Sequence, residues 1–405
     1  MRALFKWYAN QMFYKKQALK TLAIIVCISF FAPVICNETP LILKTELGCS
    51  SPLFSKWFYG TLPQNCSSVY VNNTWQYQHA IFVLLPPIPY SANFYDYNNA
   101  PFISPFQKQS DGLNNTELSW RYRHWLGTGK KGEDVLACCI YGLANSIFIS
   151  GAATLLAALI AFVLGITSGF FGNNYFKLSW LHYLGLVGGF LSGYYFMVLL
   201  FPLWFDFNNL IFAGAFIAIW LIVFLVFSQL AKRFSVSGSL NFPYARIIHF
   251  FVNIFSAIPA LILIVVVIAW LKPTVTTLII LLAITGWPTL MRIAYIETKQ
   301  IMTKPYMLTA TAMGYSADYI IRKEILPNFS NAFATTTIYV FAALLVAESS
   351  LTFLGLGTPY PFVTLGSLLG QFNENFEAWW IAVFPTTLLF IVLFCLHTIA
   401  KSKTN

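Results

Sequence analysis

The chain contains little charge and few of the residues that build catalytic or metal sites. Only 9% of its 405 residues are Asp, Glu, Lys or Arg, and it has 14 acidic residues, 5 histidines and 7 cysteines. Soluble domains carry roughly 25% charged residues, so a soluble globular protein is excluded. No cysteine or histidine spacing matches a metal site, and no Ser-His-Asp or paired-carboxylate arrangement indicates an enzyme. We therefore expect no metal, no cofactor and no catalytic residue in this chain.

The chain also lacks a phosphate-binding loop. The pair Gly129-Lys130 lies in the stretch His124–Gly142, HWLGTGKKGEDVLACCIYG. The pattern G-x-x-x-x-G-K-[ST] would require Gly at position 124 and Ser or Thr at position 131, where this chain has His and Lys. The chain is therefore not expected to hydrolyse ATP by itself.

What is present is hydrophobic, at 58% of the residues. A helix needs about 20 apolar residues to cross the hydrocarbon, and eight segments satisfy this: 20–42, 143–172, 179–203, 206–230, 247–271, 274–295, 332–356 and 378–399. The first also has the basic flank of a signal peptide, but no Ala-x-Ala cleavage site follows it, so we expect an uncleaved anchor. The sequence predicts an all-α polytopic membrane protein with about eight transmembrane helices.

Basic residues indicate the orientation, because loops rich in Lys and Arg face the cytoplasm. They fall before the first span, in alternate loops and after the last span: Arg2, Lys6, Lys15, Lys16, Lys20, Lys177, Lys232, Arg233, Arg246, Arg292, Lys299, Lys304, Arg322, Lys323, Lys401 and Lys403. The opposite short loops carry Lys272 and the acidic residues Asp206, Glu374 and Glu377. This pattern predicts a cytoplasmic N-terminus (1–19), loop (296–331) and tail (401–405), and a periplasmic cap formed by residues 43–142.

The cap is rich in Asn, Pro, Tyr and Phe, a composition typical of irregular structure with few regular elements. Cys49 and Cys66 lie in it with sixteen residues between them. In an oxidising compartment this separation suits a disulfide, and two free thiols fit the sequence equally well.

The stretch Tyr306–Asn328, YMLTATAMGYSADYIIRKEILPN, is a charged and small-residue island between two apolar runs. Residues 306–313 are predicted to form a short helix that Gly314 ends in the left-handed conformation. Ser316 is a suitable N-cap for a second short helix, and Pro327 is expected to end that helix. Four residues of the first helix fall near one face: Tyr306, Met307, Ala310 and Met313.

This loop resembles the cytoplasmic "EAA" loop of ABC-importer permeases. The matching residues are Ala310, Ala312, Gly314, Ile325, Leu326 and Pro327. In that family the loop is a coupling helix that sits in a cleft of the ATPase subunit, so the resemblance implies a docking role for residues 306–313. Leu308 stands where the family has Glu. An ordinary connecting loop is the alternative.

The stretch His124–Gly142 resembles the block H-x-L-G-T-D-x-x-G-R-D-V-x-x-R-x-I-Y-G of oligopeptide and dipeptide permeases. The matching residues are His124, Leu126, Gly127, Thr128, Gly132, Asp134, Val135, Leu136, Ile140, Tyr141 and Gly142. Gly129, Glu133 and Cys138 replace the family's Asp, Arg and Arg, so any salt bridge made by those family residues is in doubt here.

A third resemblance covers Glu348–Gly366, which is similar to the family segment E-A-A-L-S-F-L-G-L-G. Gly355 and Gly357 permit a tight turn or a close backbone approach. Glu348, inside an apolar run, either lines the translocation pathway or the subunit interface, or has a structural hydrogen-bonding role. Pro259 and Pro288 also match family positions and are expected to kink their helices.

The resemblance covers roughly residues 118–175 and 245–400, with 173–244 as a two-helix insertion before the permease core at 245–400. It implies the C-type permease subunit of the oligopeptide/dipeptide/nickel ABC importer family, in the bacterial inner membrane. The implied partners are a second permease subunit, two cytoplasmic ATPase subunits that bind ATP, and a periplasmic substrate-binding protein. The alternative function is an ion-coupled secondary carrier or channel without an ATPase, which would need ionisable residues at mid-bilayer.

The charge pattern yields a test of topology. Reporter fusions at Ser237, Thr303 and Ser402 should report a cytoplasmic location, and a fusion at Asn93 a periplasmic one, because basic loops are retained inside. Paired alkaline phosphatase and fluorescent-protein fusions measure this directly. A periplasmic signal at Thr303 would contradict the assignment of the loop.

Overall fold

The computed structural model describes residues 2–45, 48–53, 55, 68–71, 74–77, 80–110, 117–173, 175, 177–178, 180–200, 218, 220–229, 240–270, 273–359 and 361–401. The chain divides into two compact units. The first contains Met1–Val163 and Ile254–Asn405, and the second contains Leu164–Asn253.

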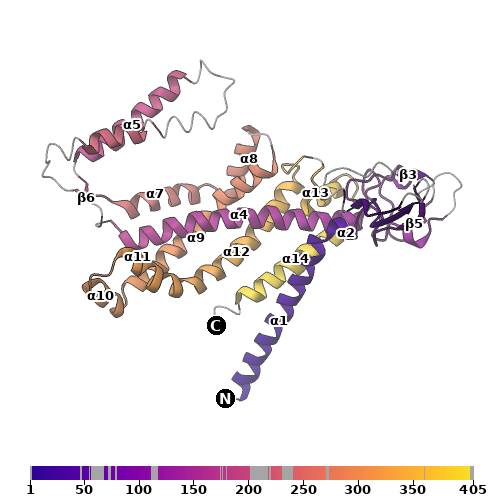
Figure 1. The fold of residues 1–405 in the computed structure, drawn as a ribbon, viewed down its shortest axis with the longest axis horizontal. Helices are drawn as coiled ribbons and strands as arrows, with labels where there is room; N and C mark the ends of the chain where they lie inside the picture. Colours follow the sequence, from indigo (N-terminus) through magenta and orange to yellow (C-terminus); the bar gives the residue numbers. More distant parts are fainter. Residues whose placement is uncertain are drawn as a thin grey trace. The chain divides into compact units, whose positions relative to one another are not determined.

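Long apolar helices dominate the described residues. Four are long and apolar enough to cross a membrane: α4 (Val135–Phe171), α9 (Val275–Met302), α12 (Leu326–Phe353, with the turns from Ala317 before it) and α14 (Trp379–Lys401). A fifth candidate is the pair α7 (Tyr244–Ala257) and α8 (Ala260–Trp270). Figure 1 shows α4, α9 and α12 running alongside one another. The chain is therefore a multi-pass, all-α membrane protein, as the composition predicts.

The two prolines singled out in the sequence behave differently. Pro259 lies between α7 and α8, whose axes are bent by 85°, so the predicted kink is confirmed there. Pro288 lies inside α9, which continues from Val275 to Met302 without a break. Pro288 therefore does not break the helix, and the bend expected there stays a prediction. Pro288 and the neighbouring Gly286 and Trp287 are buried by the packing around α9.

The predicted first span, 20–42, is wrong at its C-terminal end, and its start at residue 20 lies inside a longer helix. Helix α1 covers Arg2–Phe30, and a single turn, α2, covers Ala32–Ile35. Pro33 occupies the start of that turn, where its missing N–H costs little. From Ile42 the chain is a β-strand, β1 (Ile42–Thr45). Hydropathy alone did not show this change, because residues 40–43 are as apolar as the helix before them.

The cap contains more regular structure than its composition suggests. Strand β1 pairs antiparallel with β2 (Gly48–Ser50) and β5 (Ala80–Leu84), in the order β2-β1-β5. A hairpin is formed by β3 (Ser68–Val71) and β4 (Thr74–Tyr77). The 3₁₀ turns η1 (Tyr97–Asn99) and η2 (Trp120–Tyr122) follow. Cys66 lies outside the described residues, so the disulfide with Cys49 stays a prediction.

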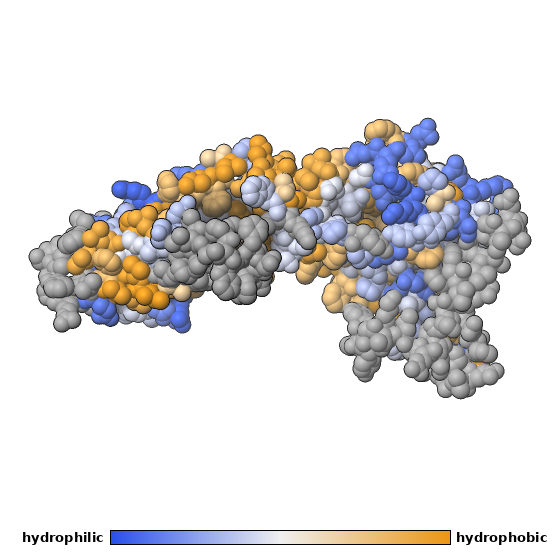
Figure 2. Space-filling view, turned by 90° about the horizontal axis from the view of Figure 1, so that it is seen from above, coloured by the Kyte–Doolittle hydropathy of each residue, from blue (hydrophilic) through white to orange (hydrophobic). Residues whose placement is uncertain are grey.

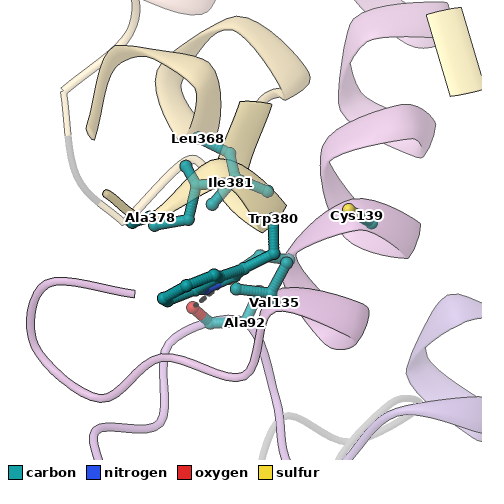
Figure 3. Packing of buried hydrophobic residues seen from close by; sticks show 8 residues of the cluster. Ala92, Val135, Cys139, Leu368, Ala378, Trp380 and Ile381 are labelled. Atoms are coloured by element: carbon teal, nitrogen blue, oxygen red, sulfur yellow. Dashed lines mark hydrogen bonds between the residues drawn. The ribbon is translucent and has the colours of Figure 1, made fainter. Parts of the chain in front are cut away.

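One apolar cluster joins the cap to the helices. Figure 3 shows the ring of Trp380, from the start of α14, reaching toward Ala92 of the cap, with Val135 of α4 beside it. Ile381 and Leu368 also belong to the cluster, Leu368 from the short helix α13 (Leu365–Gly370). Figure 2 shows hydrophobic residues gathered over the helices, and more hydrophilic ones toward the end where Figure 1 places the cap strands. The cap is thus packed onto the ends of three helices.

The second unit contains the proposed insertion. Helix α5 (Trp180–Leu200) agrees closely with the predicted span 179–203. Strands β6 (Lys177–Leu178) and β7 (Leu240–Asn241) pair antiparallel at its base. Of the predicted span 206–230, most lies outside the described residues, and residues 220–229 form a short apolar helix.

Candidate functional site

The loop between α9 and α12 contains two short helical turns. Helix α10 covers Pro305–Ala312, close to the predicted 306–313. Gly314 follows it with φ +77°, and its N–H donates to the carbonyl of Thr311 at 3.1 Å. The N–H of Tyr315 donates to the carbonyl of Ala310 at 3.3 Å. This pair of bonds is the Schellman motif, so the left-handed glycine predicted from the sequence is confirmed.

The second turn is capped as predicted but does not end at the proline. Ser316 is the N-cap of α11 (Ala317–Tyr319), and its side chain accepts a hydrogen bond from the N–H of Tyr319. A π-helical turn, η4 (Ile320–Ile325), leads directly into α12. Pro327 lies in the first turn of α12, so the expected stop is wrong. Proline is accepted there because the wider π turn moves the preceding carbonyls away from its ring.

The exposure of α10 corrects the predicted docking face. Met307 and Ala310 are buried against the chain itself, at 1% and 8% exposure. Leu308 and Met313 are 65% and 69% exposed, and Tyr306 is 39% exposed. The four residues predicted to share one docking face are therefore divided. Met307 and Ala310 pack inward, and Tyr306 and Met313 are exposed.

The loop presents apolar side chains beside charged ones. Tyr315 and Tyr319 are also partly exposed, and their ring centroids lie 4.6 Å apart. Arg322 and Asp318 form an exposed ion pair at 2.8 Å. Ala312 and Pro327 are exposed as well, Leu326 is half-buried, and Ile325 is fully buried. A surface of this kind on a loop is accounted for when a partner covers it.

Glu348 is fully buried inside the chain. Its Oε2 accepts from the hydroxyl of Ser349 at 3.3 Å, and hydroxyls of Ser146 on α4 and Thr364 before α13 lie near the carboxyl. Among the described residues its Oε1 has no hydrogen-bond partner. Of the two roles left open by the sequence, burial favours the structural one, because the Glu348 side chain is fully enclosed by this chain.

The glycines after Glu348 shape the end of α12. Gly355 has φ +79° and follows the last turn, and a Cβ at Gly357 would lie 2.3 Å from the Thr352 side chain. A Cβ at Gly366 would lie 2.2 Å from the Ser349 carbonyl oxygen. The glycine at position 366 thus allows α12 and α13 to approach closely.

The motif at 124–134 forms a buried charge cluster. The Nδ1 of His124 lies 2.9 Å from Oδ1 of Asp134, and its Nε2 lies 3.3 Å from Oδ2 of Asp96. All three side chains are at most 2% exposed. Because each ring nitrogen faces a carboxylate, both nitrogens donate and the imidazole is charged. A histidine enclosed in this way is a structural residue, out of reach of any solute.

The cluster joins the cap to two helices. Asp134 also caps α4, because its Oδ2 accepts from the N–H of Ala137 at 2.8 Å. The Thr128 hydroxyl donates to the Asn99 carbonyl at 2.7 Å, and the Thr128 carbonyl accepts from the Trp380 indole N–H of α14 at 3.1 Å. Gly127 and Gly132, both at φ +81°, allow the turns between these residues. The motif therefore fixes the cap on α4 and α14.

Three members of this site were missed in the sequence. Asp96 supplies the second carboxylate, Gln109 exchanges two hydrogen bonds with the His124 backbone at 2.7 and 2.9 Å, and Tyr90 stacks on the imidazole with centroids 4.4 Å apart. One signal was available for Asp96, which is the single acidic residue between positions 47 and 110.

The electrostatics of His124 follow from its two neighbours. Burial disfavours the charged imidazole, but the hydrogen bonds and charges of Asp134 and Asp96 outweigh burial and raise the pKa of His124 to about 9. Burial also opposes ionisation of Asp96, and its hydrogen bonds from His124 and Asn99 lower the pKa of that carboxyl below its usual value. The three charges stabilise one another in a medium of low dielectric.

This arrangement predicts a pH dependence. The pKa of His124 is raised on folding, so its stabilisation is fully present below the unfolded pKa of about 6.5 and is lost as the pH rises through about 9. The melting temperature of the purified protein should decrease as the pH is raised from about 6.5 to about 9. The decrease should correspond to a loss of a few kcal/mol in the free energy of unfolding. His124→Gln should be less stable at pH 6.5 and lack this part of the slope. A slope that is identical in both proteins would contradict the charge assignment.

The profile of the family described as "Binding-protein-dependent transport system inner membrane component" matches residues 234–405. The dipeptide transport system permease protein DppC of Bacillus subtilis is 24% identical over 301 residues, which are 74% of this chain and 72% of that protein. The inner membrane ABC transporter permease protein YejE of Escherichia coli is 24% identical over 364 residues, 88% of this chain and 82% of that protein.

A shorter stretch is more similar still. A putative peptide transport system permease protein of Brucella suis is 35% identical over 130 residues, 32% of this chain and 44% of that protein. The resemblance inferred from three separate motifs thus agrees with matches that extend along most of the chain. Residues 234–405 match the family of binding-protein-dependent transport system inner membrane components, and most of the chain is similar to a dipeptide transport permease and to an ABC transporter permease.

Proposed function

We propose that this chain is the permease subunit of an ATP-driven ABC importer that forms part of the translocation pathway for peptides. The relatives that it matches over most of their length are named as dipeptide and oligopeptide transport permeases. Its helices provide the membrane-spanning framework of such a subunit. The chain has no phosphate loop, so the ATP is bound and hydrolysed by partner subunits.

The observation that carries the proposal is the form of the 303–325 loop. A short helix, closed by a Schellman motif, joins two long apolar helices and exposes Leu308 and Met313. Its inner residues, Met307 and Ala310, pack on the chain. The loop is therefore attached firmly to α9 and α12 and still offers an apolar contact to a cytoplasmic ATPase subunit.

The complete transporter contains a second permease subunit, two cytoplasmic ATPase subunits and a periplasmic binding protein. In this arrangement the protein lies in the bacterial inner membrane with both termini inside, and the binding protein docks on the side of the cap. Closure of the ATPases on ATP moves the loop, and α12 carries the movement toward α13 and the cap. An ion-coupled carrier would instead need Glu348 to meet the transported ion, and that residue is enclosed by the chain.

The exposed side chains of the loop are the place to test the proposal. Leu308→Asp and Met313→Asp should each reduce ATPase association and peptide uptake at least tenfold, because docking would desolvate an unpaired charge at a cost of about 3 kcal/mol. Protein abundance in the membrane should be unchanged, since both side chains are exposed. Copurification of the ATPase subunits and uptake of labelled peptide are the measurements.

The matched control is Asp318→Asn, an exposed change on the next turn that should be mild. Ala310→Asp is not a suitable docking variant, because Ala310 is buried and the change would disturb the packing of α10. Normal uptake by both Leu308→Asp and Met313→Asp would show that the loop is a connector, and the carrier function would then be the better explanation.

A second prediction concerns Gly314, where only the backbone conformation is restrictive. A Cβ there would meet no atom within 4 Å, but φ is +77°, which costs a β-branched residue about 1–3 kcal/mol. Gly314→Val should therefore reduce coupling between ATP hydrolysis and uptake, and Gly314→Asn should nearly preserve it, since Asn tolerates this region. Equal activities of the two variants in proteoliposomes would contradict the role of the motif.

A further inference from the structure

The cap has an exposed aromatic side chain next to the membrane-facing surface of α14. Phe106 is 82% exposed and is stacked on Trp379, with ring centroids 6.2 Å apart and planes inclined by 24°. Trp379 is the first residue of α14, a helix apolar enough to cross the membrane. Phe106 therefore lies at the height where α14 enters the bilayer.

Trp379 is also the end of a continuous exposed stripe. Along α14 the exposed apolar side chains are Trp379, Val383, Phe390 and Phe394, whose spacing places them on one helical face. Thr387 lies on the same face, and its hydroxyl is satisfied by the Val383 carbonyl at 2.7 Å, as a hydroxyl on a lipid-facing helix must be. The ring of Phe106 extends this face beyond the end of the helix.

The turn that presents Phe106 satisfies its own polar groups. The N–H of Gln107 donates to the Ser104 carbonyl at 3.1 Å, and the N–H of Phe106 to the Ser104 hydroxyl at 3.3 Å. The N–H of Ser104 donates to Oε1 of Gln107 at 2.9 Å. The Arg123 side chain donates to the Pro105 carbonyl at 2.9 Å. Pro105 itself has no backbone N–H to satisfy. A loop with its backbone groups bonded in this way can enter a region poor in water.

The turn is also held in place from both sides. Pro105 is buried before Phe106, and Gln109 after it is buried and bonded to the His124 backbone. The turn that carries Phe106 is thus connected through Gln109 to His124 of the charge cluster. This connection keeps the Phe106 ring from folding back onto the cap. Trp379, on which Phe106 is stacked, is of a residue type enriched at the membrane–water interface.

We propose that the turn Ser104–Gln107 is an interfacial anchor, which inserts Phe106 among the phospholipids of the leaflet on the side of the cap. The partner is the lipid bilayer itself, chosen because Phe106 continues the apolar stripe of α14. The anchor holds the cap at a fixed height beside α14, in addition to the bonds that the cap makes with α4.

The test uses the full chain in phospholipid nanodiscs. A photoreactive p-benzoyl-phenylalanine replaces Phe106, and after irradiation mass spectrometry measures covalent phospholipid adducts. The same probe at Phe390, in the middle of the α14 stripe, gives the yield of a lipid-facing position. Tyr97 is the matched control, because it is 75% exposed in the cap but its ring contacts Tyr95 there.

A lipid adduct at position 106 in a yield at least fivefold above that at position 97 is the expected result. Equal yields at 106 and 97, with a strong adduct at 390, would overturn the proposal. In the assembled transporter, a crosslink from position 106 to another protein subunit in place of lipid would also overturn it and would assign this face to a subunit interface.

Discussion

The attachment of the cap depends on one buried cation held between two carboxylates. His124 receives Asp134 on one ring nitrogen and Asp96 on the other, and each carboxylate has a second task in its own segment. Asp134 caps the first turn of α4, and Asp96 accepts from the N–H of Asn98 in η1. Removing the charge of His124 would leave two carboxylates buried close together without a cation, which is far more costly than removing all three charges. The three residues therefore act as a unit.

The cluster of His124, Asp134 and Asp96 explains why the motif at 124–134 is rich in residue types that are common in active sites. Histidine, aspartate and threonine at 124–134 would suit an active site in a soluble enzyme, yet the side chains of His124, Thr128 and Asp134 are each at most 2% exposed. Thr128 and Trp380 extend the same network from the cap to α14. The network provides rigidity between a β-containing cap and a helical bundle, in addition to the apolar cluster that contains Ala92 and Trp380.

Helix caps and short helices of this protein could be predicted from the sequence more accurately than contacts between residues that are far apart in the chain. The Gly314 cap, the Ser316 cap and the helix at 306–313 each depend on a few neighbouring residues, so they were predictable. The buried face of α10 was not, because apolar residues occur on both of its sides and only the packing decides that Met307 turns inward. Asp96 was missed because its partner is 28 residues away, and the β1 strand because apolar residues suit a strand as well as a helix. Pro327 misled because proline is equally typical of a helix end and of a helix start.

The continuity through Pro327 has a mechanical consequence. From Ala317 to Phe353 the chain is one uninterrupted helical rod of 37 residues, about 55 Å long at 1.5 Å per residue. Its single irregularity is the π turn at 320–325, where hydrogen bonds are spaced more widely than in the rest of the rod. A displacement of the loop end is therefore transmitted along the helix without further bending between residues 326 and 353. It bends the rod at that one joint or tilts it as a whole, and the far end, against α13, sweeps through the larger distance.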